Sequence, residues 1–244
     1  MNYVADPLEN RLENIKANMK RGLATVHVRP PHEGVFAICA GGPSLKDEIG
    51  KIKSLQREGA KIVAVNGVYN YLLKNKVIPD IFVMADTKKG NSRFVSNPKQ
   101  ETIYMIAADC HPDVFDALSD RDVRMWIPIE YNIPAPTKIG GGSTVTLRAL
   151  TLGYIFGFRK FHLFGFDGSI KDSHHAYPQE ENDGEEVVDV NFHGKLYKMT
   201  NWMIAQAEDF DKYLRAYGDY FDLNIHTKGV MKDIQQHIGE NNAS

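Results

Sequence analysis

The sequence predicts an α/β fold: a doubly wound, mostly parallel β-sheet, with a helix before it and a β-hairpin plus helix after it. Short apolar runs of strand length alternate with segments of helical character, an alternation typical of parallel sheets whose strands are joined by helices. Glycine-rich turns at residues 40–43 and 140–142 each precede a predicted helix, as expected at junctions beside such a sheet.

The elements follow in chain order. Leu8, Leu12, Ile15 and Met19 recur at helical spacing, so an amphipathic helix is predicted within residues 1–23. Strands are predicted at residues 35–39, 61–67, 80–86, 102–108, 123–129, 160–167 and 220–225. Helices are predicted after residue 44 and at residues 68–74, 112–118, 143–158 and 201–217. Residues 187–193 and 195–200 predict a hairpin that turns at Gly194 and lies outside the sheet.

Composition excludes several classes of protein. The 244 residues carry 29 basic and 31 acidic side chains, a net charge of −2, which gives no bulk attraction to nucleic acid or to an anionic membrane. The first 16 residues are polar and charged, so no signal peptide is expected, and the longest apolar run, residues 145–158, is too short to span a bilayer. Cys39 and Cys110 are expected to be buried, reduced thiols. We therefore expect a cytoplasmic protein without a membrane span or nucleic-acid partner, and homo-oligomerisation is left open.

The first glycine turn follows the strand at residues 35–39. Gly41, Gly42 and Pro43 turn the chain, and Ser44 stands where a helix N-cap is expected. Because glycines allow close approach to backbone N–H groups at a helix start, this turn is a candidate phosphate site. An ordinary turn with a serine cap is the alternative, and the segment alone does not decide between them.

The second glycine turn precedes the helix at residues 143–158. Gly141 and Gly142 lead into Ser143 or Thr144, either of which can cap that helix, so its N–H groups form a second candidate anion site. The alternative is a flexible loop before a well-capped helix. Neither turn matches the phosphate loop of ATPases or the dinucleotide fingerprint, since the required Gly-Lys-Ser/Thr and G-x-G-x-x-G spacings are absent.

Polar residues also follow the other predicted strands. Ligands of open α/β sheets bind beyond the carboxyl ends of the strands, so these residues are expected to share one rim. They are Asn66, Asp86, Asp109 and Asp167. Asp86 and Asp167 are candidate ligands of Mg²⁺ or acceptors for sugar hydroxyls, with capping of a nearby turn as the alternative.

The loop at residues 168–186 carries two adjacent histidines, His174 and His175. Adjacent histidines point apart and have no cysteine or acidic partner at ligand spacing, which disfavours zinc. Either histidine is a candidate general acid or base or a phosphate contact, and a solvated loop histidine is the alternative.

Three segments carry a family resemblance: CAGGPSL at 39–45, IPDIFVMAD at 78–86 and the run at 140–167. Together they resemble the MptE-like family, which contains 6-hydroxymethylpterin diphosphokinases and the motility accessory factors thought to transfer nonulosonic acids. The first and third segments are also similar to CMP-sialic acid-dependent sialyltransferases. Small stand-alone members of this kind look similar to proteins encoded by tailed phages.

The resemblance covers residues 35 to about 177 and implies a Rossmann-like nucleotide-binding fold. We expect a single such domain over residues 31–226, between a helical extension at 1–30 and a tail at 227–244. It implies that the two glycine turns contact nucleotide phosphates, that Asp86 holds a metal or a sugar hydroxyl, and that Asp167 closes the site. The candidates taken together are His174, His175 and Asp167 for catalysis, Asp86 and Asp167 for Mg²⁺, and Gly41, Gly42, Pro43, Ser44, Asn66, Asp86, Gly141, Gly142, Ser143 and Thr144 for the nucleotide.

Three functions follow as hypotheses. The first is a nucleotide-dependent transferase that moves a nonulosonate- or sialate-like sugar from a CMP-sugar to an acceptor. The second is an ATP- and Mg²⁺-dependent diphosphokinase of a 6-hydroxymethylpterin-like alcohol. The third is a non-catalytic nucleotide-binding module. Residues 107–113 contain a single histidine, His111, where the diphosphokinases carry a histidine-rich segment, and this favours glycosyl transfer.

Overall fold

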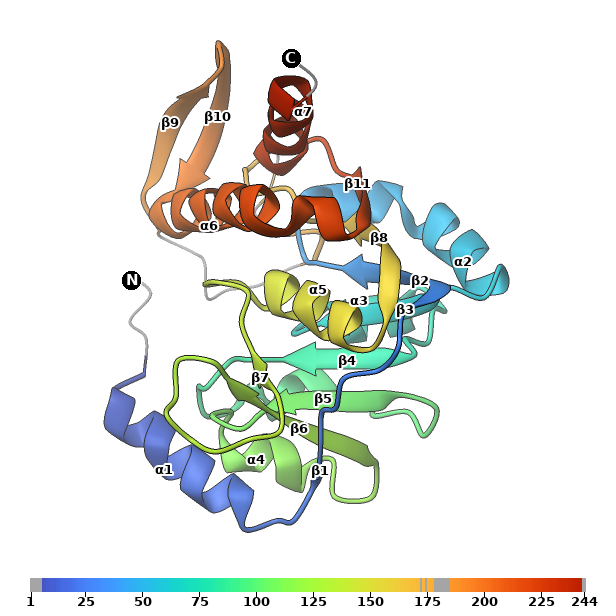
Figure 1. Cartoon of the computed structure of the whole chain (residues 1–244), viewed down its shortest axis with the longest axis vertical. Helices are drawn as coiled ribbons and strands as arrows, with labels where there is room; N and C mark the ends of the chain where they lie inside the picture. Colours follow the sequence, from blue (N-terminus) through green and yellow to red (C-terminus); the bar gives the residue numbers. More distant parts are fainter. Residues whose placement is uncertain (1–5, 172, 174, 178–184, 243–244) are drawn as a thin grey trace.

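The computed structural model describes residues 6–171, 173, 175–177 and 185–242. Within these residues, nine strands form one sheet in the order β1-β6-β5-β4-β3-β2-β8-β11, with β7 beside β6 (Figure 1). Its strands are β1 (Ala24–Thr25), β2 (His32–Cys39), β3 (Lys61–Val65), β4 (Ile81–Met84), β5 (Ile103–Ala107), β6 (Asp122–Pro128), β7 (Lys138–Ile139), β8 (Phe158–Phe164) and β11 (Asp222–His226). All of its strand pairs are parallel, which confirms the predicted sheet.

The path of the chain explains where the helices lie. From β2 to β6 the strands step across the sheet in one direction, and the chain then returns to place β8 on the other side of β2. Since parallel crossovers are right-handed, this reversal moves the connecting helix to the opposite face. Accordingly α5 (Val145–Ile155) and α6 (Asn201–Tyr217) lie in front of the sheet in Figure 1. The crossover helices of the first half are α2 (Ile49–Arg57), α3 (Val68–Lys74) and α4 (Pro112–Asp116).

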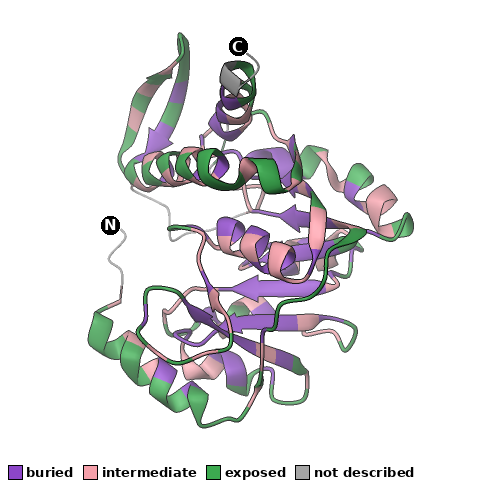
Figure 2. Ribbon diagram, viewed as in Figure 1, coloured by how far each residue is buried: buried purple, intermediate pink, exposed green. Residues whose placement is uncertain are grey.

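The core lies on the central strands. The residues of β4 are all buried, as are most of those of β3 and β5, so these strands form the purple centre of Figure 2. Strands covered by helices on both faces read in sequence as continuous apolar runs, which is why they could be predicted. Between the sheet and α3, the hydroxyl groups of Tyr69 and Tyr104 are hydrogen-bonded at 2.7 Å.

The N-terminal helix α1 (Leu8–Met19) packs beyond the end of β5. Its buried Asn18 donates hydrogen bonds to the carbonyl oxygens of Ala108 (2.9 Å) and Cys110 (2.8 Å), and Asn14 donates to that of Asp109 (3.1 Å). The helix is therefore fastened to the loop that follows β5, on the rim where the polar strand ends lie.

The C-terminal part holds the predicted hairpin, β9 (Val187–Phe192) and β10 (Lys195–Thr200), which forms a separate antiparallel ribbon beside α6 (Figure 1). After residue 226 the sequence predicts only a tail, whereas the structure has helix α7 (Val230–Asn242). Its residues Val230, Met231, Ile234 and Ile238 are buried, so apolar contacts fix this helix. The two-residue strands β1 and β7 were also not anticipated, because elements so short leave no periodic pattern.

Candidate functional site

A cavity of about 620 Å³ lies beyond the carboxyl ends of β2, β3, β4, β5 and β8, a size that suits a small-molecule ligand. The cavity brings together most of the sequence-predicted site residues. Those that line it are Gly41, Gly42, Pro43, Asn66, Asp86, Ser143, Thr144, Asp167 and His175. Ser44, Gly141 and Gly142 lie just outside the lining, and His174 lies outside the described residues.

The first glycine turn differs from the prediction. Residues Pro43–Asp47 form a short 3₁₀ helix, η1, and α2 begins only at Ile49, so Ser44 is not a helix N-cap. The Ser44 N–H donates to Asp167 Oδ2 (3.0 Å), and the Gly42 N–H donates to the Gly165 carbonyl (2.7 Å). A Cβ on Gly42 would lie 2.5 Å from the Gly165 oxygen and would overlap the Asp167 carboxylate. Glycine is required here because the end of β8 packs directly against the turn.

Both carboxylate oxygens of Asp167 have partners within the protein. Oδ2 accepts from Ser44 N–H, and Oδ1 accepts from the hydroxyl of Thr227. The side chain is buried, so Asp167 joins three segments: the end of β8, the turn after β2 and the loop before α7. The anion beside the Ser44 N–H is therefore a carboxylate of the protein itself.

Asp86 and Asp167 were predicted to hold Mg²⁺. They follow β4 and β8, which lie three strand spacings apart, about 14 Å, so the strand order separates the two residues and does not by itself make them a joint site. Asp86 Oδ1 accepts from the Lys88 N–H (3.1 Å), and burial raises the Asp86 pKa. No group of three or more His, Cys, Asp or Glu side chains in the described part of the chain could hold a metal.

The second glycine turn opens α5 as a well-capped helix. Thr144 is the N-cap, because its Oγ1 accepts from the Thr146 N–H (3.2 Å). Gly141 and Gly142 have φ of 127° and 72°, the region that favours glycine. The Ser143 N–H donates to Asp209 Oδ2 of α6 (2.8 Å), so a protein carboxylate lies beside this turn also. Ser143 to Thr146 nevertheless line the cavity, which places the N-terminal end of α5 in its wall.

The described part of the 168–186 loop covers the ends of β2 and β3. The carbonyl of Gly41 accepts from the Ala176 N–H (2.9 Å) and lies 3.2 Å from His175 Nδ1. A carbonyl only accepts, so His175 carries a proton on Nδ1 and presents Nε2 as its other ring nitrogen. The Tyr177 ring is stacked on that of His175, with ring centroids 5.7 Å apart.

Four residues that line the cavity were not among the site residues predicted from sequence. Of these, only Asp109 was noted, as the residue that follows a strand. Asp109 and Asn91 line the cavity and are 5% and 3% exposed. Arg11 of α1 and Asp6 before it reach the same cavity. Arg11 and Asp6 reach the cavity because α1 is held to the loop after β5, and no local sequence pattern carries that information.

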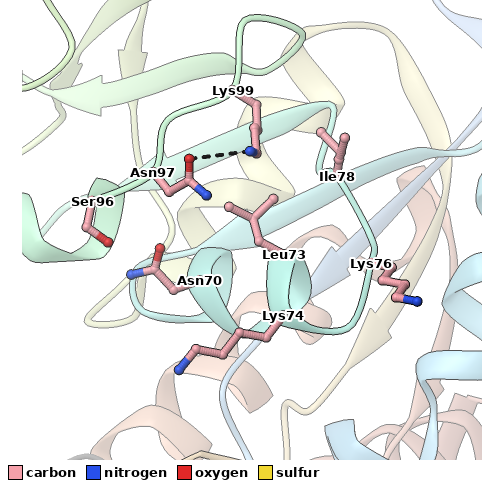
Figure 3. Close-up of a pocket in the computed structure, with 8 residues that line it drawn as sticks. All are labelled: Asn70, Leu73, Lys74, Lys76, Ile78, Ser96, Asn97 and Lys99. Atoms are coloured by element: carbon pink, nitrogen blue, oxygen red, sulfur yellow. Dashed lines mark hydrogen bonds between the residues drawn. The ribbon is translucent and has the colours of Figure 1, made fainter.

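A second hollow, of about 590 Å³, lies outside this site (Figure 3). It is bounded by α3 and by the loops that enter β4 and β5, at the opposite ends of the strands from the first cavity. Its charged lining residues are Lys74, Lys76 and Lys99, and Lys99 donates to Asn97 (3.3 Å). It contains none of the predicted site residues.

In the part of the chain that the structure describes, no helix combines the length and apolar character needed to cross a membrane. A family model described as 6-hydroxymethylpterin diphosphokinase MptE-like matches residues 9–173. Among solved structures, the MAf glycosyltransferase from Magnetospirillum magneticum AMB-1 matches with a TM-score of 0.72 and 19% identity, over 91% of this chain and 37% of that chain. The likeness is one of fold, and the present chain spans little more than a third of that protein's length. No curated protein matches the chain.

Proposed function

Because the chain belongs to the MptE-like family, we propose that it is a nucleotide-dependent transferase whose substrate binds in the 620 Å³ cavity. We further propose glycosyl transfer from a CMP-sugar as its reaction. The observation that carries the proposal is the convergence of the N-terminal end of α5, the Gly41–Pro43 turn and Asn66 on one cavity at the carboxyl ends of parallel strands. The fold shared with a MAf glycosyltransferase favours a sugar as the transferred group.

The nucleotide phosphate would bind at the start of α5. Helix α5 has 11 residues, enough for the positive end of its dipole to attract an anion, and its first turn lines the cavity. The turn after β2 would play a different part, since the N–H groups of Gly42 and Ser44 already donate within the protein. Gly41, Pro43 and Asn66 would shape the wall against the nucleoside.

The chemistry required is departure of a phosphate-bearing leaving group. The start of α5 would stabilise the negative charge that develops on the phosphate as the bond to the sugar breaks. In its imidazolium form His175 would donate a proton to that group from Nε2, because Nδ1 is held by the Gly41 carbonyl, which fixes the ring. Asp167, with both oxygens occupied, would position the turn and take no proton. His174 remains a candidate from sequence alone.

The description of the matched family model favours a second candidate, transfer of diphosphate from ATP to an alcohol. In that reaction Mg²⁺ would arrive with the nucleotide phosphates, because the strand order separates Asp86 from Asp167. A non-catalytic nucleotide-binding module is the third possibility, and it differs from the other two in showing binding without turnover.

Calorimetry with CMP, CDP and ATP, with and without Mg²⁺, tests binding, and release of CMP from CMP-N-acetylneuraminate or of AMP from ATP tests turnover. We expect binding of CMP without Mg²⁺ and release of CMP. Changing His175→Ala should lower turnover and leave CMP binding within about twofold, whereas the exposed His27→Ala, remote from the cavity, should change neither. AMP release would favour the second candidate, binding alone the third, and no binding of any nucleotide would overturn the proposal.

A further inference from the structure

We propose that Asp109 and Asn91 bind the hydroxyl group of the acceptor substrate, and that Asp109 takes the proton of that hydroxyl during transfer. This inference rests on the proposed function, because only a transferase has an acceptor. It does not depend on which of the two reactions occurs, since a sugar acceptor and an alcohol that receives diphosphate both react through a hydroxyl oxygen.

Asp109 has a buried carboxyl group of which only one oxygen has a hydrogen-bond partner among the described residues. Its Oδ2 accepts from the hydroxyl of Tyr131 (2.8 Å), while its buried Oδ1 has no hydrogen-bond partner among the described residues. Buried polar atoms in folded proteins nearly always have a partner, and leaving one without costs stability. The side chain lines the cavity, so an atom of a bound ligand can supply what the protein does not.

Asn91 presents the complementary atom. It is 3% exposed and lines the same cavity, and its Nδ2 has no partner in the described part of the chain. It opens the 3₁₀ helix η2 (Asn91–Val95), and the preceding Gly90 N–H donates to Asp113 Oδ2 (2.9 Å). That bond ties η2 to the segment just after Asp109, so Asn91 and Asp109 lie in linked loops that follow the adjacent strands β4 and β5.

An amide nitrogen donates and a carboxylate oxygen accepts, so the pair matches a group that can do both. A hydroxyl group accepts from Asn91 Nδ2 through its oxygen and donates its proton to Asp109 Oδ1. A phosphate or carboxylate ligand would satisfy Asn91 but would be repelled by Asp109. The chemistry of these two atoms therefore suits an alcohol.

The positions of these residues in the cavity are consistent with separate roles in binding the nucleotide and the acceptor. Gly41 and Asn66 follow β2 and β3, Asp109 and Asn91 follow β5 and β4, and α5 extends from the first group to the second, since its Arg148 acts on Asp109. One cavity thus offers donors for an anion and a donor–acceptor pair for a hydroxyl. A transfer reaction needs both, side by side.

The step balances within these groups. The acceptor oxygen forms a bond to the anomeric carbon of the sugar, its proton passes to Asp109 Oδ1, and the bond from that carbon to the phosphate oxygen breaks with its electron pair leaving on CMP. Burial raises the pKa of Asp109, which makes the carboxylate a stronger base. The charged and titratable groups that act on it are Tyr131, Glu130 and Arg148, and Arg11 acts on Tyr131 from α1.

The test uses water as the acceptor, with release of CMP from CMP-N-acetylneuraminate, or of AMP from ATP with Mg²⁺, as the readout. Changing Asp109→Asn should lower kcat by about 10²- to 10⁴-fold, the range of a lost general base, with the Kd for CMP or ATP within twofold. Asn91→Leu should lower kcat about tenfold and also leave nucleotide binding unchanged. The matched control is Asp80→Asn, a hydrogen-bonded carboxyl at the opposite end of β4, which should behave as wild type.

The pH profile separates a proton acceptor from a structural carboxyl. The rate of the wild type should rise with pH through the pKa of Asp109, and Asp109→Asn should lack this rise. Tyr131→Phe should move the rise to higher pH, because the Tyr131 hydrogen bond lowers that pKa. Wild-type kcat in Asp109→Asn, or an unmoved rise in Tyr131→Phe, would overturn the inference and leave the proposed function standing. A wild type that neither binds nor turns over either nucleotide would overturn both.

Discussion

The carboxylate of Asp167, just beyond β8, accepts a hydrogen bond of 3.0 Å from the backbone N–H of Ser44 in the turn after β2. Strand β8 is therefore linked to β2 by its ladder and also at its tip. Because Asp167 simultaneously accepts from the hydroxyl of Thr227, one buried side chain fixes the position of the loop before α7 as well. Its contribution to stability can be measured separately from any contribution to binding.

Changing Asp167→Ala should lower the free energy of unfolding by about 2–4 kcal/mol, because two hydrogen bonds to a charged group are lost and the Ser44 N–H is left buried without a partner. Asp167→Asn should cost less, since an amide can still accept from Ser44 and donate to Thr227. Urea denaturation of both variants checks this. An Asp167→Ala protein as stable as the wild type would mean that these bonds contribute nothing to the fold.

Changing Asp209→Asn should tighten nucleotide binding about two- to fivefold, because a negative charge beside the start of α5 opposes an anion there by roughly 0.3–1 kcal/mol. The amide oxygen can still accept from the Ser143 N–H, so the turn keeps its shape. The control is Asp211→Asn on the same helix, whose partner is Arg215. Calorimetry in low and high salt should show the gain shrinking with salt, and equal affinities for the two variants would place the phosphate elsewhere.

Asp109 should make the protein less stable as pH rises. Burial raises its folded-state pKa above the ordinary value of 3.8, so its protonated form is favoured in the folded chain, and this advantage is lost as pH rises through the folded-state pKa. Asp109→Asn, which cannot ionise, should therefore have a higher Tm than the wild type at pH 8 and about the same Tm below pH 4. Thermal unfolding of both proteins between pH 4 and pH 8 tests this. A difference in Tm that becomes smaller as pH rises would contradict the predicted direction.

Asn18→Ala should lower the free energy of unfolding by about 2–4 kcal/mol, because the buried carbonyls of Ala108 and Cys110 both lose their donor. Asn10→Ala, exposed on the same helix, is the control and should fall within about 0.5 kcal/mol of wild type. If the two variants unfold alike, α1 is not held at the end of β5 by this amide.

The sheet could be predicted from sequence because its strands are buried on both faces and read as apolar runs, β3 and β4 most clearly. Of the two predicted helix caps, one is present. Thr144, one of the two residues predicted to cap α5, accepts from a residue only two positions away, whereas Ser44 does not cap α2, because a 3₁₀ helix at Pro43–Asp47 separates it from the start of α2 at Ile49.

The site could be predicted in part, because the residues that follow strands can be found from local sequence patterns. Strand ends could be found, and Asp86 and Asp167 were among them, but strand order could not, so their separation across β3 and β2 was not foreseen. Asp209, which contacts Ser143 from 66 residues away, and the buried Asn91 belong to tertiary packing alone. Residues that owe their role to a neighbour remote in sequence leave no local pattern.

The attachment of α1 has a consequence for the order of assembly during synthesis. Its amide donors reach carbonyls 90 to 95 residues further along the chain, so these contacts cannot form until β5 and the loop after it have left the ribosome. Until then the helix lacks these partners, because it is made before them. The wall that Arg11 gives to the cavity can form only at that stage, and the remaining walls, which include Asp167 and residues of α6, follow later in synthesis.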